Sequence, residues 1–128
     1  MKKEIRTENA PEALGPYSQA IIAAGPTIYI SGQLPINPKT NEFISNDLRE
    51  QTKQSLENIN AILKAENCSM SDVVNTTILL ADIKDFTAMN EVYNTFFSKP
   101  FPSRMAFAVK DIPKGALVEI SAVAIKNT

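Results

Sequence analysis

The order of apolar segments in this 128-residue chain predicts an α+β fold, with a mixed β-sheet that carries two helices on one face. Two amphipathic segments of helical period interrupt a series of short strands, and strand–helix alternation does not continue long enough for a doubly wound sheet. Several strands are apolar on both sides, so a sheet covered on one face only would leave its other face apolar. We therefore expect the chain to associate with itself through the open sheet face.

The composition is typical of one globular domain spanning residues 1–128, with 44% hydrophobic and 21% charged residues. The formal net charge of −1 lacks the excess of positive charge that is typical of nucleic-acid-binding proteins, so no nucleic-acid partner is expected. The apolar runs are too short to cross a bilayer, so no membrane partner is expected. Lys2 and Lys3 are not followed by the apolar segment of a signal peptide, which predicts a cytoplasmic protein.

The cysteine and histidine content excludes several kinds of site. Cys68 is the single cysteine of the sequence, so an intrachain disulfide and a paired-cysteine site are excluded. The sequence contains no histidine, which excludes Ser-His-Asp and Cys-His nucleophiles and the usual zinc sites. A general base in this protein must therefore be a carboxylate, a lysine, a tyrosine or water.

Three short strands are predicted in the first third of the chain, at residues 2–7, 18–25 and 27–33. The first is charged and short, which is typical of an edge strand. Gly25-Pro26 separates the other two and predicts a hairpin turn between them. Residues 34–43 are expected to form a connector rich in turns, because their two prolines bar a regular strand interior.

Two helices and a buried strand are predicted in the middle of the chain. Asn46 or Asp47 can cap the first helix, which is expected to run through Glu66, with Asn67 as a left-handed residue at its end. The β-branched run at residues 72–82 predicts a well-buried strand. Asp82 or Asp85 then opens a second helix. Its apolar stripe consists of Phe86, Met89, Val92, Tyr93, Phe96 and Phe97.

Residues 101–125 are predicted to form two strands joined by a short turn that contains proline and glycine. If the strands pair as a hairpin around residues 111–115, Arg104 of the first and Glu119 of the second lie on the same face. An arginine and a glutamate on a surface of small residues form either a structural ion pair or the floor of a site. The pattern alone leaves both alternatives open.

Five residues are candidates for binding or chemistry. Arg104 offers a planar fork of donors that suits a carboxylate, and a partly buried Glu119 could activate a water as general base. Tyr17 lies in a loop between a proline and a strand, where ligand contacts are common. Gly32 lets backbone approach a ligand closely, and Asn90 is a polar residue among apolar neighbours in the second helix. The alternatives are a boundary aromatic with an exposed hydroxyl for Tyr17, an ordinary turn for Gly32 and a solvent-facing side chain for Asn90.

Four blocks of the sequence, in order, resemble the RidA (YjgF) family. They are ENAPEALGPYSQAI, SGQLPINPKT, DFTAMNEVYNTFF and PSRMAFAVKDIPKGALVEISAVAI. The resemblance spans nearly the whole chain. It implies a two-layer fold like that of trimeric chorismate mutase, in which three subunits bring their sheets together into a barrel-like core. Ligand clefts are then expected between adjacent subunits of a homotrimer.

The resemblance also implies an enzyme, a 2-iminobutanoate/2-iminopropanoate deaminase. Such an enzyme hydrolyses reactive imines and enamines, released by pyridoxal phosphate-dependent dehydratases, to 2-keto acids and ammonia, and it needs no cofactor and no metal. Arg104 matches the family arginine that holds the substrate carboxylate, and Glu119 matches the glutamate that positions the attacking water. Tyr17, Gly32 and Asn90 match positions that line the cleft.

Two positions depart from the family pattern: Ser121 replaces the second acid of the EIE motif of many members, and the other departure follows the arginine. Many members carry a cysteine two residues after the arginine, and this sequence has Ala106 there. We expect Ala106 to be one of the substrate-binding residues. Imine hydrolysis needs an oriented C=N bond, a water and a proton, but no covalent nucleophile, so an enzyme without this thiol is expected to work. Ala106 motivates one alternative, a protein that binds 2-keto acids with little turnover. Endoribonuclease or translation-inhibitor activity is a second alternative, which the near-neutral charge and the lack of histidine oppose.

Overall fold

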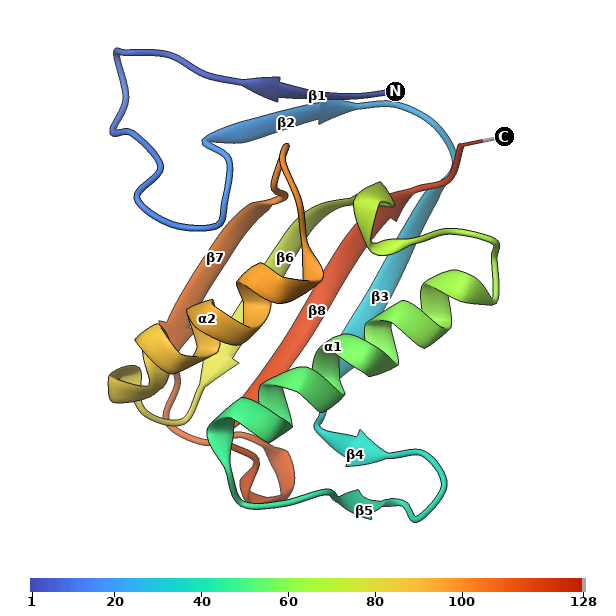
Figure 1. Cartoon of the computed structure of the whole chain (residues 1–128), viewed down its shortest axis with the longest axis vertical. Helices are drawn as coiled ribbons and strands as arrows, with labels where there is room; N and C mark the ends of the chain where they lie inside the picture. Colours follow the sequence, from blue (N-terminus) through green and yellow to red (C-terminus); the bar gives the residue numbers. More distant parts are fainter. Residues whose placement is uncertain (128) are drawn as a thin grey trace.

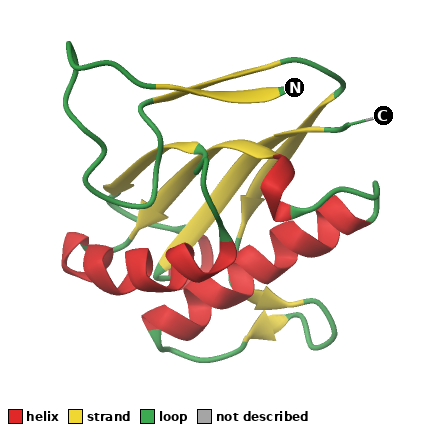
Figure 2. Cartoon of the chain, turned by 45° about the horizontal axis from the view of Figure 1, so that its top comes forward, coloured by secondary structure: helices red, strands yellow, loops and turns green. Residues whose placement is uncertain are grey.

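A four-stranded mixed sheet with the order β3-β8-β6-β7 forms the centre of the structure, a computed structural model that describes residues 1–127 (Figure 1). The sheet consists of β3 (Thr27–Gln33), β6 (Val73–Leu80), β7 (Ser103–Ala108) and β8 (Val118–Ile125). Helices α1 (Leu48–Lys64) and α2 (Phe86–Phe96) pack on the same face of this sheet (Figure 2). The predicted α+β arrangement is confirmed, and Thr128 of the predicted domain lies outside the described residues.

Two small sheets and three single-turn helices complete the fold of residues 1–127. β1 (Lys2–Ile5) pairs with β2 (Ala20–Ala23), and β4 (Ile36–Asn37) pairs with β5 (Glu42–Phe43). The short 3₁₀ helices are η1 (Met70–Asp72), η2 (Ile83–Asp85) and η3 (Pro113–Gly115). β4 and β5 lie in the connector for which no strand was predicted. They fit there because each has two residues only, and neither contains Pro35 or Pro38.

The predicted hairpin between residues 18–25 and 27–33 is wrong. Gly25 turns the chain with a φ of 138°, but β2 pairs with β1, whereas β3 pairs with β8 in the central sheet. Ile30 of β3 is buried in the core between the sheet and the helices, and Ile28 packs against that core. Burial of these side chains under α1 outweighs the local preference of the turn, because apolar burial is the larger energy.

The predicted ends of the first helix are nearly right. The Asp47 side chain accepts a hydrogen bond from the Glu50 N–H at 3.1 Å, which satisfies one of the free donors of the first turn. Asn67 follows the helix with a φ of 57°, as predicted, and the Cys68 N–H then donates to the Leu63 carbonyl at 2.9 Å. The helix itself ends at Lys64, before the predicted Glu66.

The hydrophobic core lies between the helices and the sheet. β6 is central and buried, as predicted, and its residues alternate between the covered and the open face. The largest fully buried side chains of this core are Tyr93, Leu56, Ile59, Leu63, Ile78, Leu80, Met89 and Ile120. The core therefore fixes α2 over β6 and β7, which decides the surroundings of Arg104.

The predicted hairpin between β7 and β8 is also wrong. β6 lies between them, paired in parallel with β7 and antiparallel with β8. Arg104 pairs with Thr76 and Glu119 pairs with Leu79 on this shared neighbour. Since side chains alternate along a strand, partners of Thr76 and of Leu79 point to opposite faces of the sheet. Arg104 and Glu119 therefore do not share a face, contrary to the prediction.

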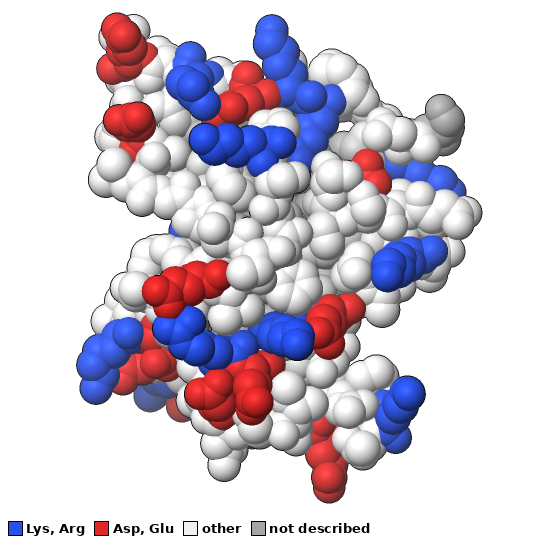
Figure 3. Space-filling model, in the orientation of Figure 1, with Lys and Arg blue, Asp and Glu red and all other residues white. Residues whose placement is uncertain are grey.

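The two faces of the molecule differ in character. On the face that carries the helices, charged side chains gather over the N-terminal hairpin and over the helices, with a largely uncharged band between them (Figure 3). The opposite face of the sheet is open and exposes large apolar side chains, among them Tyr29 at 79%, Met105 at 61% and Phe107 at 39%. None of the helices within residues 1–127 has the length and apolar character to cross a membrane.

Candidate functional site

Arg104 is positioned by the edge strand β7 and by the helix that precedes it. Its register partner Thr76 is fully buried, so the arginine projects from the helix-covered face of the sheet toward α2. There the Asn90 Oδ1 accepts a hydrogen bond from the Arg104 Nη1 at 2.7 Å. Two of the candidate residues, Arg104 and Asn90, are thus in direct contact.

Three aromatic rings surround the Arg104 guanidinium. Its central carbon lies 4.9 Å from the centroid of the Tyr93 ring, 5.4 Å from that of Tyr17 and 5.7 Å from that of Phe86. At these distances the electron-rich ring faces attract the cation without neutralising its charge. The Arg104 side chain is held from three sides and keeps a full positive charge.

No carboxylate among residues 1–127 forms an ion pair with Arg104. The ion pairs found in that range involve other residues and lie at the surface, as between Arg6 and Glu4. Burial lowers the pKa of Arg104 below its usual value, and the neighbouring Tyr93 and Tyr17 hydroxyls partly offset this effect. A half-buried arginine without a carboxylate partner is suited to bind an anionic ligand.

The loop that carries Tyr17 is fixed against the start of β7. The Leu14 N–H donates to the Tyr17 hydroxyl at 3.3 Å, and the Tyr17 N–H donates to the Gly15 carbonyl at 2.8 Å. The buried Ser18 donates its hydroxyl to the Phe101 carbonyl. These contacts hold the Tyr17 ring beside Arg104, although eighty-seven positions separate the two residues in the sequence.

Glu119 and Gly32 form a second pair on the open face of the sheet. The Glu119 carboxylate leans over the Gly32 Cα, and a side-chain carbon at position 32 would lie 2.9 Å from the Glu119 carboxyl carbon. Gly32 lies where the ladder between β3 and β8 shifts its register, between Ile30 and Gln33. Gly32 thus leaves the space that the Glu119 carboxylate occupies.

The structure divides the predicted site residues into two groups. Tyr17, Asn90 and Arg104 come together under α2, and Ala106 lies on the same face two residues further along β7. Glu119 lies two strands away and three register positions along, so its Cα is roughly 14 Å from that of Arg104 at ordinary strand spacing. Within one chain, the two residues cannot contact the same small ligand.

Two residues at this site were not predicted as functional. Phe86 and Tyr93 were expected only as part of the apolar stripe of the second helix. Together with Asn90 they have the spacing i, i+4, i+7, which places all three on one face of α2. This spacing could have revealed their role in the sequence. Residues one helical turn from Asn90 lie beside it, so Phe86 and Tyr93 share its surroundings.

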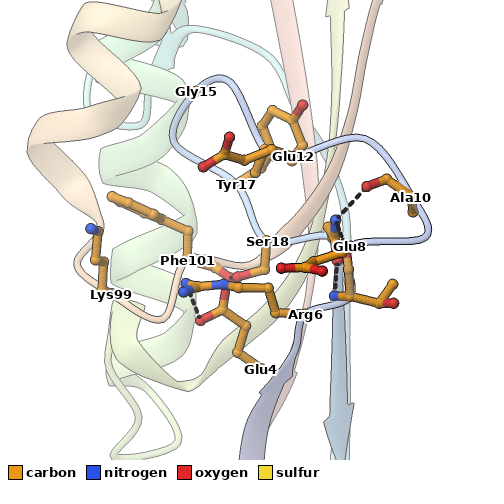
Figure 4. Close-up of a pocket in the computed structure, with 13 residues that line it drawn as sticks. Glu4, Arg6, Glu8, Ala10, Glu12, Gly15, Tyr17, Ser18, Lys99 and Phe101 are labelled. Atoms are coloured by element: carbon orange, nitrogen blue, oxygen red, sulfur yellow. Dashed lines mark hydrogen bonds and ion pairs between the residues drawn. The ribbon is translucent and has the colours of Figure 1, made fainter.

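A cavity of about 810 Å³ is lined in part by Tyr17 (Figure 4). It is enclosed by the N-terminal segment between β1 and β2 and by the segment that leads into β7, which contributes Lys99 and Phe101. Glu4 and Arg6 form an ion pair at its wall.

Comparison with known proteins identifies the family. A family model described as Endoribonuclease L-PSP matches residues 7–126. The chain belongs to this family. A member named 2-iminobutanoate/2-iminopropanoate deaminase, from Homo sapiens, is 47% identical over 127 residues, which cover 99% of this chain and 92% of that protein.

Solved structures of the family match the fold over nearly the whole chain. The structure of RidA from Psychrobacter sp. has a TM-score of 0.76 and 42% identity, and covers 97% of this chain and 99% of that one. The structure of E. coli TdcF with bound serine has a TM-score of 0.75 and 38% identity, and covers 98% of this chain and 99% of that one. The resemblance to RidA seen in the sequence is confirmed.

Proposed function

We propose that this protein hydrolyses reactive 2-imino acids, such as 2-iminobutanoate and 2-iminopropanoate, to 2-keto acids and ammonia. The observation that carries the proposal is the Arg104 guanidinium, which is half-buried, held by Asn90 and three aromatic rings, and free of any carboxylate among the described residues. A small planar ligand with one carboxylate fits such a group. The human relative that is named as a deaminase of these imines supports this substrate class.

The proposed site lies between two copies of the chain. Arg104 and Glu119 lie on opposite faces of one sheet and roughly 14 Å apart, so a single chain cannot apply both to one imino acid. A second copy whose open sheet face lies against the β7 edge of the first would bring its own Glu119 and Gly32 toward the Arg104 of the first. The exposed apolar side chains of that face support self-association. We propose a homotrimer with three such clefts.

Arg104 and Glu119 have separate roles in the proposed reaction. Arg104 binds the substrate carboxylate and fixes the direction of the C=N bond, which places the imine carbon near the water held by Glu119. The imine nitrogen takes up a proton from solvent, and Glu119 accepts a proton as the water oxygen bonds to that carbon, which gives a carbinolamine. Glu119 then passes its proton to the amine nitrogen, ammonia leaves as the C–N bond breaks, and the hydroxyl proton goes to solvent as the C=O bond forms. One water is consumed for each imine.

A thiol is not needed in this sequence of steps. Water is the nucleophile and no covalent intermediate with the protein forms, so Ala106 is compatible with turnover. Ala106 pairs with the buried Ile78 and packs against the core beside Arg104. We therefore assign Ala106 a role in shaping the wall of the cleft. We infer that the enzyme acts in the cytoplasm, where dehydratases that depend on pyridoxal phosphate release these imines.

Coupling to a threonine dehydratase tests the activity. The appearance of 2-ketobutyrate should be faster with the protein present, and Arg104→Ala should lower this effect about a hundredfold or more, because two charge-assisted hydrogen bonds are lost. Arg49→Ala is the matched control, since Arg49 lies at the surface in an ion pair with Glu91. Full activity in Arg104→Ala would exclude the proposed role of this arginine.

Mixing two inactive variants tests the division of the site between copies. Chains with Arg104→Ala and chains with Glu119→Gln are unfolded and refolded together in equal amounts. If each cleft takes its arginine and its glutamate from different copies, about one quarter of the clefts contain both residues, and about a quarter of the activity returns. If one copy supplied both residues, the mixture would stay inactive.

A binding protein with little turnover is the second candidate, and the distance between Arg104 and Glu119 within one chain favours it. In that case calorimetry would show 2-ketobutyrate binding that depends on Arg104, without faster loss of the imine. Endoribonuclease activity has support only from the family description and from the names of similar solved structures. RNA cleavage that persists in Arg104→Ala, after repeated purification, would be evidence for a site elsewhere in the protein.

A further inference from the structure

The surroundings of Arg104 differ from those of an arginine in a structural ion pair. Phe86 and Tyr93 come from α2 and Tyr17 comes from the N-terminal loop, and the three rings lie 4.9–5.7 Å from the guanidinium carbon. Asn90 accepts from Nη1 alone. Most of the five N–H donors of the guanidinium therefore stay available. An acidic residue at this place would orient the arginine equally well but would compete with the ligand for its charge.

Tyr93 is the most firmly held of these rings. Its side chain is fully buried, its hydroxyl is hydrogen-bonded to the Thr76 Oγ1 at 2.8 Å, and its ring centroid lies 4.5 Å from that of Phe97. Burial raises the pKa of Tyr93 to about 12. The phenol thus stays neutral at physiological pH, and what Tyr93 presents to Arg104 is a ring face.

We propose that Phe86 and Tyr93 are positioning residues that orient Arg104 through their ring faces and leave its charge to the ligand carboxylate. This inference rests on the proposed function for the identity of the ligand. Both residues lie on the same face of α2 as Asn90, so one helix sets the height and the direction of the guanidinium. The two rings are expected to govern ligand affinity and to have little influence on the chemical step.

Phe86→Leu is the main test, because Phe86 is half-buried and leucine keeps an apolar side chain at the position. Loss of one ring face should weaken 2-ketobutyrate binding, measured by calorimetry, about three- to tenfold and raise KM for the imine similarly. We expect kcat to stay within about twofold, because Glu119 and its water are unaffected. A purely structural role of Phe86 would lower the fraction of active protein and thus kcat, with KM unchanged.

Phe96→Leu is the matched control. Phe96 lies on the same helix, is half-buried like Phe86, and is not among the rings around Arg104. We expect this variant to bind 2-ketobutyrate like the parent. Equal weakening in Phe86→Leu and Phe96→Leu would show that the loss reflects the packing of α2, and would overturn the inference.

Tyr93→Phe separates the ring from the hydroxyl. The variant keeps the ring face and loses the hydrogen bond to Thr76, so ligand affinity should stay within about twofold of the parent. A loss as large as that of Phe86→Leu would assign the effect to the hydroxyl and would overturn the inference. If the parent binds 2-ketobutyrate but does not hydrolyse the imine, the proposed function fails, and the same binding measurements still decide the role of the rings.

Discussion

Gly32→Ala tests how precisely the Glu119 carboxylate must be placed. Gly32 does not adopt a left-handed backbone conformation, so alanine is compatible with the chain at this position. The added carbon, however, would lie 2.9 Å from the Glu119 carboxyl carbon and closer still to one of its oxygens. The carboxylate must therefore move, while the strands around it can stay in place.

The size of the effect follows from the displacement. Carbon atoms in favourable contact lie about 3.5–4.0 Å apart, so the carboxyl carbon must retreat by roughly 0.6–1.1 Å. A misplacement of about 1 Å in a catalytic group costs about a hundredfold in rate, or about 2.7 kcal/mol in activation free energy. We expect kcat to fall by this factor. KM should change little, because Arg104 still binds the substrate carboxylate.

The assay is steady-state hydrolysis of 2-iminobutanoate, with the thermal unfolding midpoint measured on the same preparations. The midpoint of Gly32→Ala should lie within about 3 °C of the parent, because a flexible side chain absorbs the overlap. Thr27→Ala, an exposed position at the start of the same strand, is the control and should be fully active. A Gly32→Ala variant with the kcat of the parent would refute the reasoning, because Glu119 would then not need its observed position.

Three further predictions concern the cleft wall, the first helix and the alkaline stability. Ala106→Cys should leave kcat within about twofold in the imine assay, because water is the nucleophile, and a large gain would indicate a step that needs a thiol. Asp47→Ala removes the cap at the Glu50 N–H and should lower the free energy of unfolding by about 1 kcal/mol in urea titrations, and no change would contradict the capping role. Burial raises the pKa of Tyr93 from the usual 10.0 to about 12, so the folded protein keeps a proton that the unfolded chain loses between these values. Stability should therefore fall as pH rises through that window, by at most about 1.4 kcal/mol per pH unit, and Tyr93→Phe should remove this fall. Parallel stability curves for the parent and Tyr93→Phe above pH 10 would show that the phenol is not protected.

Features that depend on neighbouring residues could be predicted from the sequence. Asp47 caps α1 because its carboxylate reaches an N–H three residues away, and Asn67 ends the helix because asparagine tolerates a left-handed backbone. The β-branched run forms β6 because such side chains pack well along a pleated strand, and its residues on the covered face are buried. Arg104 was found as a candidate because a charged side chain within an apolar strand is costly unless it binds a partner or a ligand.

Features that depend on which strands pair were decided by the tertiary structure alone. Short turns at Gly25-Pro26 and at residues 111–115 indicate hairpins locally, but pairing energy comes from the side chains that a strand buries. β6 forms backbone hydrogen bonds along both edges, so it lies between β7 and β8. That insertion moves Glu119 to the open face and leaves Arg104 under α2.

The sequence by itself thus determined the helices, the buried strand and the identity of the candidate residues, all through contacts within a few positions. Only the tertiary structure decided which candidates meet. It joined Arg104 to Tyr17 and Asn90, added Phe86 and Tyr93, and placed Glu119 on the other side of the sheet. The physical reason is that the face of a side chain is set by strand register, and register is set by burial of the whole sheet.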